Sequence, residues 1–299
     1  MSTNKKVINV VWFKRDLRLQ DNEAVFNASK TGIPTLLLYV FEKSLEHDSH
    51  YSARHWNFIK QSIVDINTQL QRFNTHVLAV SSEVIQVMNI IEETYKIENV
   101  FSHQETGIKI TYERDKSFKR FCKNNRINWV ENINNGIFRG LQNRANWVSN
   151  WEQYMNEPLF VFDPKEEHFI KNSEIIELSS QLEVEWIELH TGTFANIYAM
   201  LNTNLSQTHH TIKELELSKN ELKTKLNKSI KEIEISSKLA KKLNLKVAAG
   251  HGLNYQNVTL ISKIPEIEEL NIGQSIIARS VFTGLSKAIV DMKELIKND

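Results

Sequence analysis

The sequence is poor in the features that crosslink a chain or anchor it in a membrane. Its 299 residues include a single cysteine, Cys122, so no disulfide can form within the chain, and one thiolate cannot build a metal cluster. No apolar run approaches the roughly 18 residues needed to span a bilayer. Residues 1–6 are polar, unlike a secretory signal. We therefore expect a cytoplasmic protein with no membrane partner, whose one thiol is inert packing.

An excess of charge of one sign is also absent. The net charge is +1, and residues 1–158 carry 20 Lys and Arg against 17 Asp and Glu, whereas residues 159–299 carry 17 against 19. Neither part has the basic surplus typical of a stand-alone nucleic-acid-binding protein, so we do not expect DNA binding. The hydrophobic content of 41% suffices for one large core or two small ones.

The first half alternates short β-branched runs with longer amphipathic segments, the pattern of parallel strands joined by crossover helices. Asp21 or Asn22, Ser52, and Ser81 or Ser82 precede amphipathic segments and are candidate helix N-caps. These features predict a doubly wound parallel sheet of five strands. The expected strands are 7–13, 35–41, 76–80, 99–102 and 127–130, and the expected helices include 23–29, 53–73 and 83–95.

The second half keeps the strand-helix rhythm, with strands expected at 159–163, 184–190, 245–249 and 269–272. Four of its glycines directly follow predicted strands: Gly192, Gly250, Gly252 and Gly273. In a β/α barrel the rim formed by the carboxyl ends of the strands carries the active site, and glycine there lets backbone amides approach a ligand. We expect a polar loop at 203–218 and a helix from about 220 to 243. The pair His209 and His210 lacks a third ligand at suitable spacing, so no metal site is expected.

Five motifs of the first half resemble the α/β domain of the DNA photolyase and cryptochrome family. They are WFKRDLRLQDN at 12–22, YVFE at 39–42, YSARHW at 51–56, SHQETG at 102–107 and NGIFR at 135–139. The likeness spans roughly residues 6–158. In that family this domain can hold a light-harvesting antenna pigment, whereas the flavin and the DNA lesion bind a separate helical domain. No counterpart of the helical domain follows here, so the resemblance implies neither FAD binding nor photorepair by this chain.

A folate or deazaflavin antenna is the cofactor that this first resemblance implies. His103, Gln104 and Glu105 follow the end of a strand, where open α/β sheets bind ligands, so they are candidate pigment contacts or part of the scaffold. Arg15, Asp16 and Arg18 have two interpretations as well. They form a salt-bridged loop that fixes the first strand-helix turn, or they contact the pigment.

Three motifs of the second half resemble pyridoxine 5'-phosphate synthase. They are EWIELHTGT at 185–193, AAGHGLNY at 248–255 and ELNIG at 269–273, and FVFDP at 160–164 is similar to the barrel strand before them. The likeness covers roughly residues 159–299 and implies the last four strand-helix units of a (β/α)₈ barrel. That enzyme condenses 3-amino-2-oxopropyl phosphate with 1-deoxy-D-xylulose 5-phosphate, which closes the pyridine ring of vitamin B6, and it requires no cofactor.

The second resemblance implies roles for individual residues. His251 takes the family's general-acid position, and Glu188 takes that of the carboxylate that supports charged intermediates. Gly252, Gly273 and Gln274 match substrate and phosphate contacts after the last two strands. The family usually has Gly-His where this chain has Gly273 and Gln274, which replaces an ionisable donor by an amide. The alternative for His251 is a loop histidine that is hydrogen-bonded to a neighbouring carbonyl. The alternative for Glu188 is a partner in a structural ion pair.

Residues 1–158 contain no counterpart of the groups that the first four barrel strands supply in that family, an Asn-x-Asp-His segment, a catalytic His and Arg, and a Glu base. We therefore expect two domains, 1–158 and 159–299, of which the second binds phosphorylated small molecules without completing the reaction. An open half-barrel exposes strand edges and apolar surface, so we expect the first domain to dock on it or two chains to pair as a homo-oligomer. A pigment-binding module and a fusion product without function are the alternatives.

Overall fold

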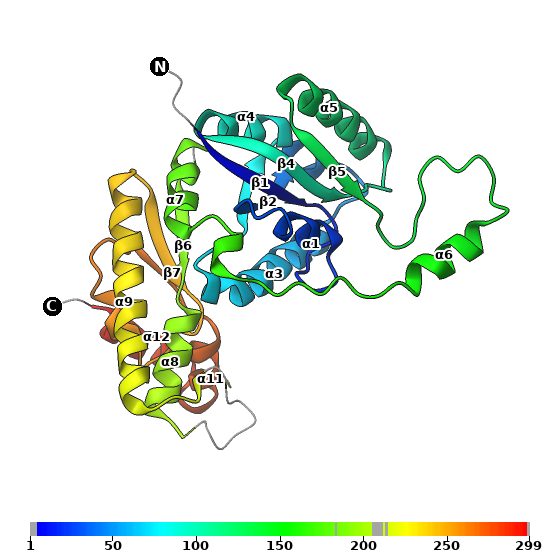
Figure 1. Ribbon diagram of the computed structural model, residues 1–299. Coiled ribbons are helices and arrows are strands. Elements are labelled where there is room, and N and C mark those ends of the chain that lie inside the picture. The colour runs from blue at the N-terminus through cyan, green and yellow to red at the C-terminus, as the bar shows by residue number, and fades with distance from the viewer. Residues whose placement is uncertain (1–4, 183, 205–211, 213–214, 298–299) are drawn as a thin grey trace. The chain divides into compact units, whose positions relative to one another are not determined.

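The computed structural model describes residues 5–182, 184–204, 212 and 215–297 and divides into two compact units, Met1–Leu178 and Ser179–Asp299 (Figure 1). The division falls later in the chain than the expected boundary after Pro158. The pair His209 and His210, with most of the expected loop at 203–218, lies outside the described residues. No helix in the described ranges has both the length and the apolar character needed to cross a membrane.

Unit 1 is built on a five-stranded sheet in the order β3-β2-β1-β4-β5, in which every neighbouring pair is parallel. This confirms the predicted doubly wound sheet. Most residues of β1 and β2 are buried, as expected for strands covered on both faces. The strands are β1 (Lys6–Phe13), β2 (Thr35–Glu42), β3 (Leu78–Ser82), β4 (Tyr95–His103) and β5 (Asn128–Asn132).

Helices cover both faces of this sheet, with α4 and α5 on one side and α1 and α3 on the other (Figure 1). Asn22 caps α1 by accepting a hydrogen bond from the Val25 amide at 3.0 Å, as expected. Ser52 is the N-cap of α3, again as expected. The third cap prediction is wrong, because Ser81 and Ser82 still belong to β3 and Glu83 precedes α4. The helices are α1 (Glu23–Ser29), α2 (Lys43–Glu46), α3 (Ala53–Leu70), α4 (Val84–Thr94), α5 (Lys109–Asn125), α6 (Trp147–Met155) and α7 (Asn172–Gln181), with 3₁₀ turns at Gln71–Phe73 and Glu166–His168.

Residues 159–163 do not form the barrel strand that the sequence predicts. They run as irregular chain within unit 1, where Phe162 is buried in the core beside Phe169. Phe160 packs on Phe26 at 5.4 Å between ring centroids, and its amide donates to the Asp21 carboxylate at 3.1 Å. The aromatic residues Phe160 and Phe162, whose alternation suggests a strand, instead pack against other apolar side chains of unit 1.

Unit 2 contains a three-stranded parallel sheet in the order β6-β7-β8, so its described residues form three of the four strands expected. Phe194 and Ala195 of α8 and Leu222 and Leu226 of α9 pack into its core. The strands are β6 (Trp186–His190), β7 (Lys246–Gly250) and β8 (Glu269–Asn271); the helices are α8 (Gly192–Asn202), α9 (Lys219–Lys242), α10 (Val258–Ser262), α11 (Gln274–Thr283) and α12 (Leu285–Ile296).

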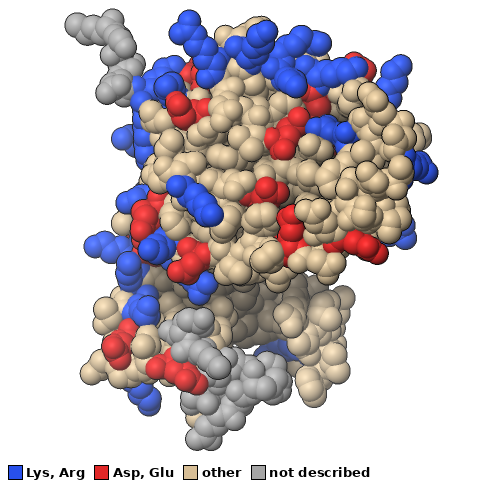
Figure 2. Space-filling model, turned by 45° about the vertical axis from the view of Figure 1, so that its right-hand side comes forward, with Lys and Arg blue, Asp and Glu red and all other residues tan. Residues whose placement is uncertain are grey.

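On the face of the molecule that Figure 2 shows, Lys and Arg side chains gather along the upper edge, whereas side chains of both signs lie over the rest. Many of the oppositely charged neighbours form ion pairs between exposed side chains, such as Lys96 with Glu98 and Lys116 with Glu113. Exposed pairs of this kind contribute roughly 0–1 kcal/mol each to stability. The fold therefore depends on the apolar cores and on the buried polar contacts described next.

Candidate functional site

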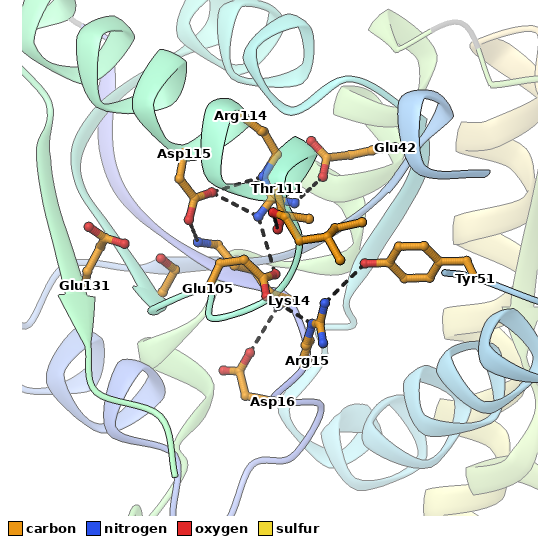
Figure 3. Close-up of polar contacts among 12 residues, drawn as sticks. Lys14, Arg15, Asp16, Glu42, Tyr51, Glu105, Thr111, Arg114, Asp115 and Glu131 are labelled. Atoms are coloured by element: carbon orange, nitrogen blue, oxygen red, sulfur yellow. Dashed lines mark hydrogen bonds and ion pairs between the residues drawn. The ribbon is translucent and has the colours of Figure 1, made fainter. Parts of the chain in front are cut away.

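A buried network of charged side chains lies at the carboxyl ends of β1 and β4 in unit 1 (Figure 3). Lys14 follows β1, and its ammonium group contacts the Asp115 carboxylate at 3.0 Å, with both side chains at most 5% exposed. Arg114 bonds Asp115 at 2.9 Å and also pairs with Glu42, which ends β2. Arg15 reaches Glu105 at 3.1 Å. The strand order reverses between the neighbouring strands β1 and β4, and the carboxyl ends of these two strands thus carry paired charges.

Burial and pairing act in opposite directions on these groups. Burial lowers the pKa of Lys14, and the neighbouring Asp115 offsets only part of that effect. Burial likewise raises the pKa of Glu42 despite the pull of Arg114. The pKa of Asp16 is affected first by burial, which raises it, but the hydrogen bond and charge of His103 outweigh burial and the pKa falls below its ordinary value. Removing one partner of such a network leaves an uncompensated buried charge.

The loop after β1 is held by side-chain contacts to its own backbone. Asp16 accepts from the Lys14 amide at 3.1 Å and bonds the His103 ring. Asn22 donates to the Asp16 carbonyl at 3.1 Å, and Arg18 donates to the Asp21 carbonyl at 2.9 Å. The loop-fixing interpretation therefore has a contact for each of the residues it names. Pigment contact by the same residues stays a prediction.

A small cavity of ≈ 50 Å³ opens beside this network at the carboxyl ends of β1 and β2. Tyr51 stacks on Trp56 at 4.9 Å and 13° between ring planes, so the wall carries two parallel aromatic faces. One oxygen of Glu42, Oε1, is buried without a hydrogen-bond partner. Glu105 lines the cavity, whereas His103 is bonded to Asp16 and lies outside its wall. The lining residues are Trp12, Phe13, Lys14, Arg15, Tyr39, Val40, Glu42, Leu45, Tyr51, Trp56, Ile59, Glu105 and Arg114.

Gln104, the third predicted pigment contact, does not line that cavity. Its amide N–H donates to the Asn132 carbonyl at 2.8 Å and so extends the pairing of β4 with β5. Its side-chain oxygen Oε1 is buried without a partner. His103, Gln104 and Glu105 are consecutive in the sequence, but each lies in a different environment in the structure.

The candidate site of unit 2 lies at the carboxyl ends of β6 and β7. His251 directly follows β7 and has a positive φ of 74°, and Gly252 follows with φ of 77°. Glu188 on β6 places Oε1 at 3.6 Å from His251 Nε2. Thr191, fully buried after β6, donates its hydroxyl to the His251 carbonyl at 2.7 Å. The structure therefore brings the two predicted catalytic residues together.

Glycine is required at two positions of this loop. A Cβ on Gly250 would lie 2.3 Å from Glu188 Oε1, so a side chain there would displace the carboxylate. A Cβ on Gly252 would lie 2.5 Å from Ala195 Cβ, and its left-handed φ also favours glycine. The Gly-His-Gly sequence thus lets the loop pass close to β6 and α8 while presenting the His251 ring, which is 36% exposed.

His190 stacks on His251 with 4.1 Å between ring centroids and 8° between ring planes. Its Nδ1 accepts a hydrogen bond from the Gly192 amide at 3.1 Å. Burial, with the neighbouring His251 second, lowers the pKa of His190 to about 4. At neutral pH the His190 ring is therefore uncharged, and the stacked pair holds at most the charge of His251.

Gly273 and Gln274 lie at the same edge of this sheet. Gly250 pairs with Asn271, so the residues that follow β7 and β8 emerge side by side. Gly273 is the N-cap residue of α11, and Gln274 is its exposed first residue. Ser275 donates to the Leu253 carbonyl at 3.0 Å and ties this helix start to the His251 loop. A helix N-terminus presents free amide N–H groups, which suit a phosphate.

Several site residues were missed by sequence reasoning. Asp115 and Arg114 lie within the α5 segment, whose charges resemble those of any solvated helix face. Nothing in their spacing marks them as buried. His190 lies within a quoted motif, but its stacking on His251 depends on the pairing of β6 with β7. Among the described residues, no group of three His, Cys, Asp or Glu side chains is placed to bind a metal ion.

The two parts of the chain are similar to different protein families. Residues 9–138 match the family model described as DNA photolyase. Residues 163–298 match the family model described as pyridoxal phosphate biosynthesis protein PdxJ. The chain therefore joins a photolyase-type α/β segment to a PdxJ-type segment, as the two sets of motifs indicate.

Several curated proteins similar to this chain are pyridoxine 5'-phosphate synthases. A pyridoxine 5'-phosphate synthase of Aliarcobacter butzleri is 82% identical over 141 residues, which is 47% of this chain and 51% of that protein. The synthase of Sulfurovum sp. is 60% identical over 124 residues, or 42% of this chain and 48% of that protein. The synthase of Campylobacter hominis is 47% identical and covers 53% of this chain and 58% of that protein. The chain spans about half the length of these relatives.

Among solved structures, an archaeal photolyase of Sulfolobus tokodaii with two FAD molecules is 14% identical with a TM-score of 0.45, and the match covers 86% of this chain and 60% of that one. A cryptochrome of Synechocystis sp. is 13% identical with a TM-score of 0.45, and the match covers 88% of this chain and 62% of that one.

The low pKa of His190 predicts a loss of stability in acid. The unfolded side chain has a pKa of about 6.5, so the unfolded state binds more protons than the folded state between about pH 6.5 and about pH 4. Unit 2 should therefore lose stability as the pH falls through that window. Because the ring is only partly buried, the loss is on the order of 1 kcal/mol. Nuclear magnetic resonance of the ring protons, assigned with His190→Asn, should show His190 titrating near pH 4. A midpoint near the ordinary value would contradict this description.

Proposed function

We propose that unit 2 binds phosphorylated small molecules of the kind used in pyridoxine 5'-phosphate synthesis. The observation that supports this proposal best is the cluster of His251, Glu188 and the Gly250–Gly252 backbone at the carboxyl ends of adjacent strands. The start of α11 at Gly273 and Gln274 adds amide donors for a phosphate dianion. The high identity to pyridoxine 5'-phosphate synthases over this part points to the same ligand class.

In this proposal His251 acts as the proton donor. Its ring is partly exposed and has Glu188 Oε1 at 3.6 Å, so a carboxylate stands ready to stabilise positive charge on the imidazole or on a bound imine. The neutral His190 ring supports His251 from one face without adding a competing positive charge. Thr191 fixes the backbone on which His251 stands.

We further propose that this chain does not complete ring closure by itself. In the described part of unit 2, β6 and β8 are the outer strands of the sheet, so no strand faces His251 from the opposite side of a barrel. The chain also spans about half of the matched synthases. Apolar side chains on α11 and α12 are exposed, which favours association into a homo-oligomer. They are Ile277, Val281, Phe282, Leu285 and Val290.

A second candidate function is pigment binding by unit 1. The observation that favours it is the buried Glu42 Oε1, which has no partner in the wall of the cavity beside Tyr51 and Trp56. A flat ring system with an N–H donor matches the chemistry of that wall, because it could stack on the aromatic pair at the mouth of the cavity and donate to Glu42. A folate or a deazaflavin has this chemistry. When bound, either would absorb near-ultraviolet or blue light.

Gly252→Ala should weaken phosphate-ligand binding by unit 2. The added methyl group would lie 2.5 Å from Ala195 Cβ and force the His251 loop to move. Calorimetry with the intact chain and 1-deoxy-D-xylulose 5-phosphate should show saturable binding for the natural sequence and a loss of at least roughly tenfold in affinity for the variant, since both steric overlap and a left-handed φ act against it. Light scattering on the same samples reports whether copies associate.

Gly284→Ala is the matched control. Gly284 also has a left-handed φ of 80°, but a Cβ there meets no atom within 4 Å. A side chain is therefore disfavoured by the backbone φ at both positions, but only Gly252 lies in the His251 loop. Equal loss of binding in both variants, or no binding by the natural sequence, would contradict the proposed site.

Tyr51→Ala should weaken pigment binding by unit 1, because it removes one of the two stacked rings in the cavity wall. Titration of the intact chain with a deazaflavin or a folate should quench tryptophan fluorescence, and the variant should bind roughly tenfold more weakly, the size of one aromatic stacking contact. Tyr112→Ala serves as the control, because Tyr112 is exposed on α5 and does not line the cavity. No quenching by either ligand would rule this candidate out.

A further inference from the structure

Unit 1 contains a second, larger pocket at the carboxyl end of β5, separate from the cavity beside Tyr51. Its volume is ≈ 520 Å³. The end of β5, the loop that follows it, α6 and the first residue of α1 form its walls. The lining residues are Glu23, Glu131, Asn132, Ile133, Phe138, Asn150, Gln153, Tyr154, Glu157 and Phe160.

The wall on the α6 side is held in place by specific contacts. Tyr154 donates its hydroxyl to the Ile133 carbonyl at 3.0 Å and packs edge-to-face on Phe138 at 6.5 Å. Gly136 has a left-handed φ of 65°, and a Cβ there would lie 2.8 Å from the Trp151 ring. Glycine at this point therefore lets α6 approach the loop closely. The pocket is thus held together by close contacts between α6 and the loop after β5, which are more than ten residues apart in the sequence.

One buried polar group in the pocket wall lacks a partner. Asn132 is 5% exposed, and its side-chain oxygen Oδ1 has no hydrogen-bond partner. A buried amide oxygen without a donor is unfavourable, and such atoms are uncommon in folded proteins. Because Asn132 lines the pocket, a ligand that donates an N–H from inside it would satisfy this oxygen.

The charge of the pocket has one sign. Glu23, Glu131 and Glu157 line it, and no Lys or Arg is among its lining residues. Glu131 is paired with Arg139 at 2.6 Å, whereas Glu23 and Glu157 form no ion pair or hydrogen bond through their carboxylates within the described chain. Burial, followed by the charges of Glu23 and Asp21, raises the pKa of Tyr154, and the charge of Arg18 offsets part of that rise. A phosphate or carboxylate ligand is therefore disfavoured.

We propose that this pocket binds a planar organic cation that carries N–H donors, such as an amidinium or a protonated amino-substituted heteroaromatic ring. Its N–H groups would donate to Asn132 Oδ1 and to the free carboxylates. Its ring would contact the aromatic side chains of Phe138, Tyr154 and Phe160. This ligand class differs from the phosphorylated ligands proposed for unit 2, so the two proposals stand or fall separately.

Benzamidine and benzoate test this proposal on the intact chain, because they share one ring and carry opposite charges. Saturation-transfer nuclear magnetic resonance should show saturable binding of benzamidine and none of benzoate at the same concentration. Glu157→Gln should weaken benzamidine binding roughly three- to tenfold, the size of one partly screened charge interaction. Asn132→Leu, which keeps the branched shape of the side chain and removes the oxygen, should weaken it by a similar factor.

Glu152→Gln is the matched control, because Glu152 is an exposed residue of α6, five positions before Glu157, and does not line the pocket. It should leave benzamidine binding within about twofold of the natural chain, since exposed charges outside the pocket are screened. If Asn132→Leu fails to fold, as judged by circular dichroism, the benzamidine affinity of Glu157→Gln, a substitution at an exposed position, still tests the proposal. Equal binding of benzoate, or equal effects of Glu157→Gln and Glu152→Gln, would overturn the proposal.

Discussion

Parallel strands bring their carboxyl ends to one edge of a sheet, and every candidate site in this chain follows from that constraint. In unit 1, the ends of β1, β2 and β4 bring Lys14, Glu42 and Glu105 within reach of Arg114. In unit 2, the ends of β6 and β7 bring Glu188 and His251 together. The side chains differ, but the same geometry collects them from distant parts of the sequence.

Much of this organisation could be predicted from local sequence. The β-branched runs of unit 1 are buried on both faces of the sheet, so they give a strong strand signal, and Asn22 and Ser52 mark helix starts through their short polar side chains. The motif around His251 also predicts its loop, because two glycines beside a histidine suit a tight turn against a neighbouring strand. The strand runs, the N-cap residues and the Gly-His-Gly motif each depend on neighbouring residues in the sequence, so they can be recognised without the structure.

The remaining features depend on contacts between distant residues. Residues 159–163 alternate like a strand, but strand formation needs a partner, and Phe160 and Phe162 find apolar neighbours in unit 1 instead. The burial of Asp115 and the separation of His103 from Glu105 depend in the same way on how α5 and the β1 loop pack. No spacing rule could have predicted these environments.

A ring-closing reaction needs groups that converge from all around a barrel, and we propose that the described residues of unit 2, which place His251 and Glu188 on a three-stranded sheet, do not supply enough of them. The most direct test supplies the purified chain with 3-amino-2-oxopropyl phosphate and 1-deoxy-D-xylulose 5-phosphate and measures pyridoxine 5'-phosphate by mass spectrometry. The account predicts ligand binding without product. Product formed at a rate that depends on His251 would contradict it.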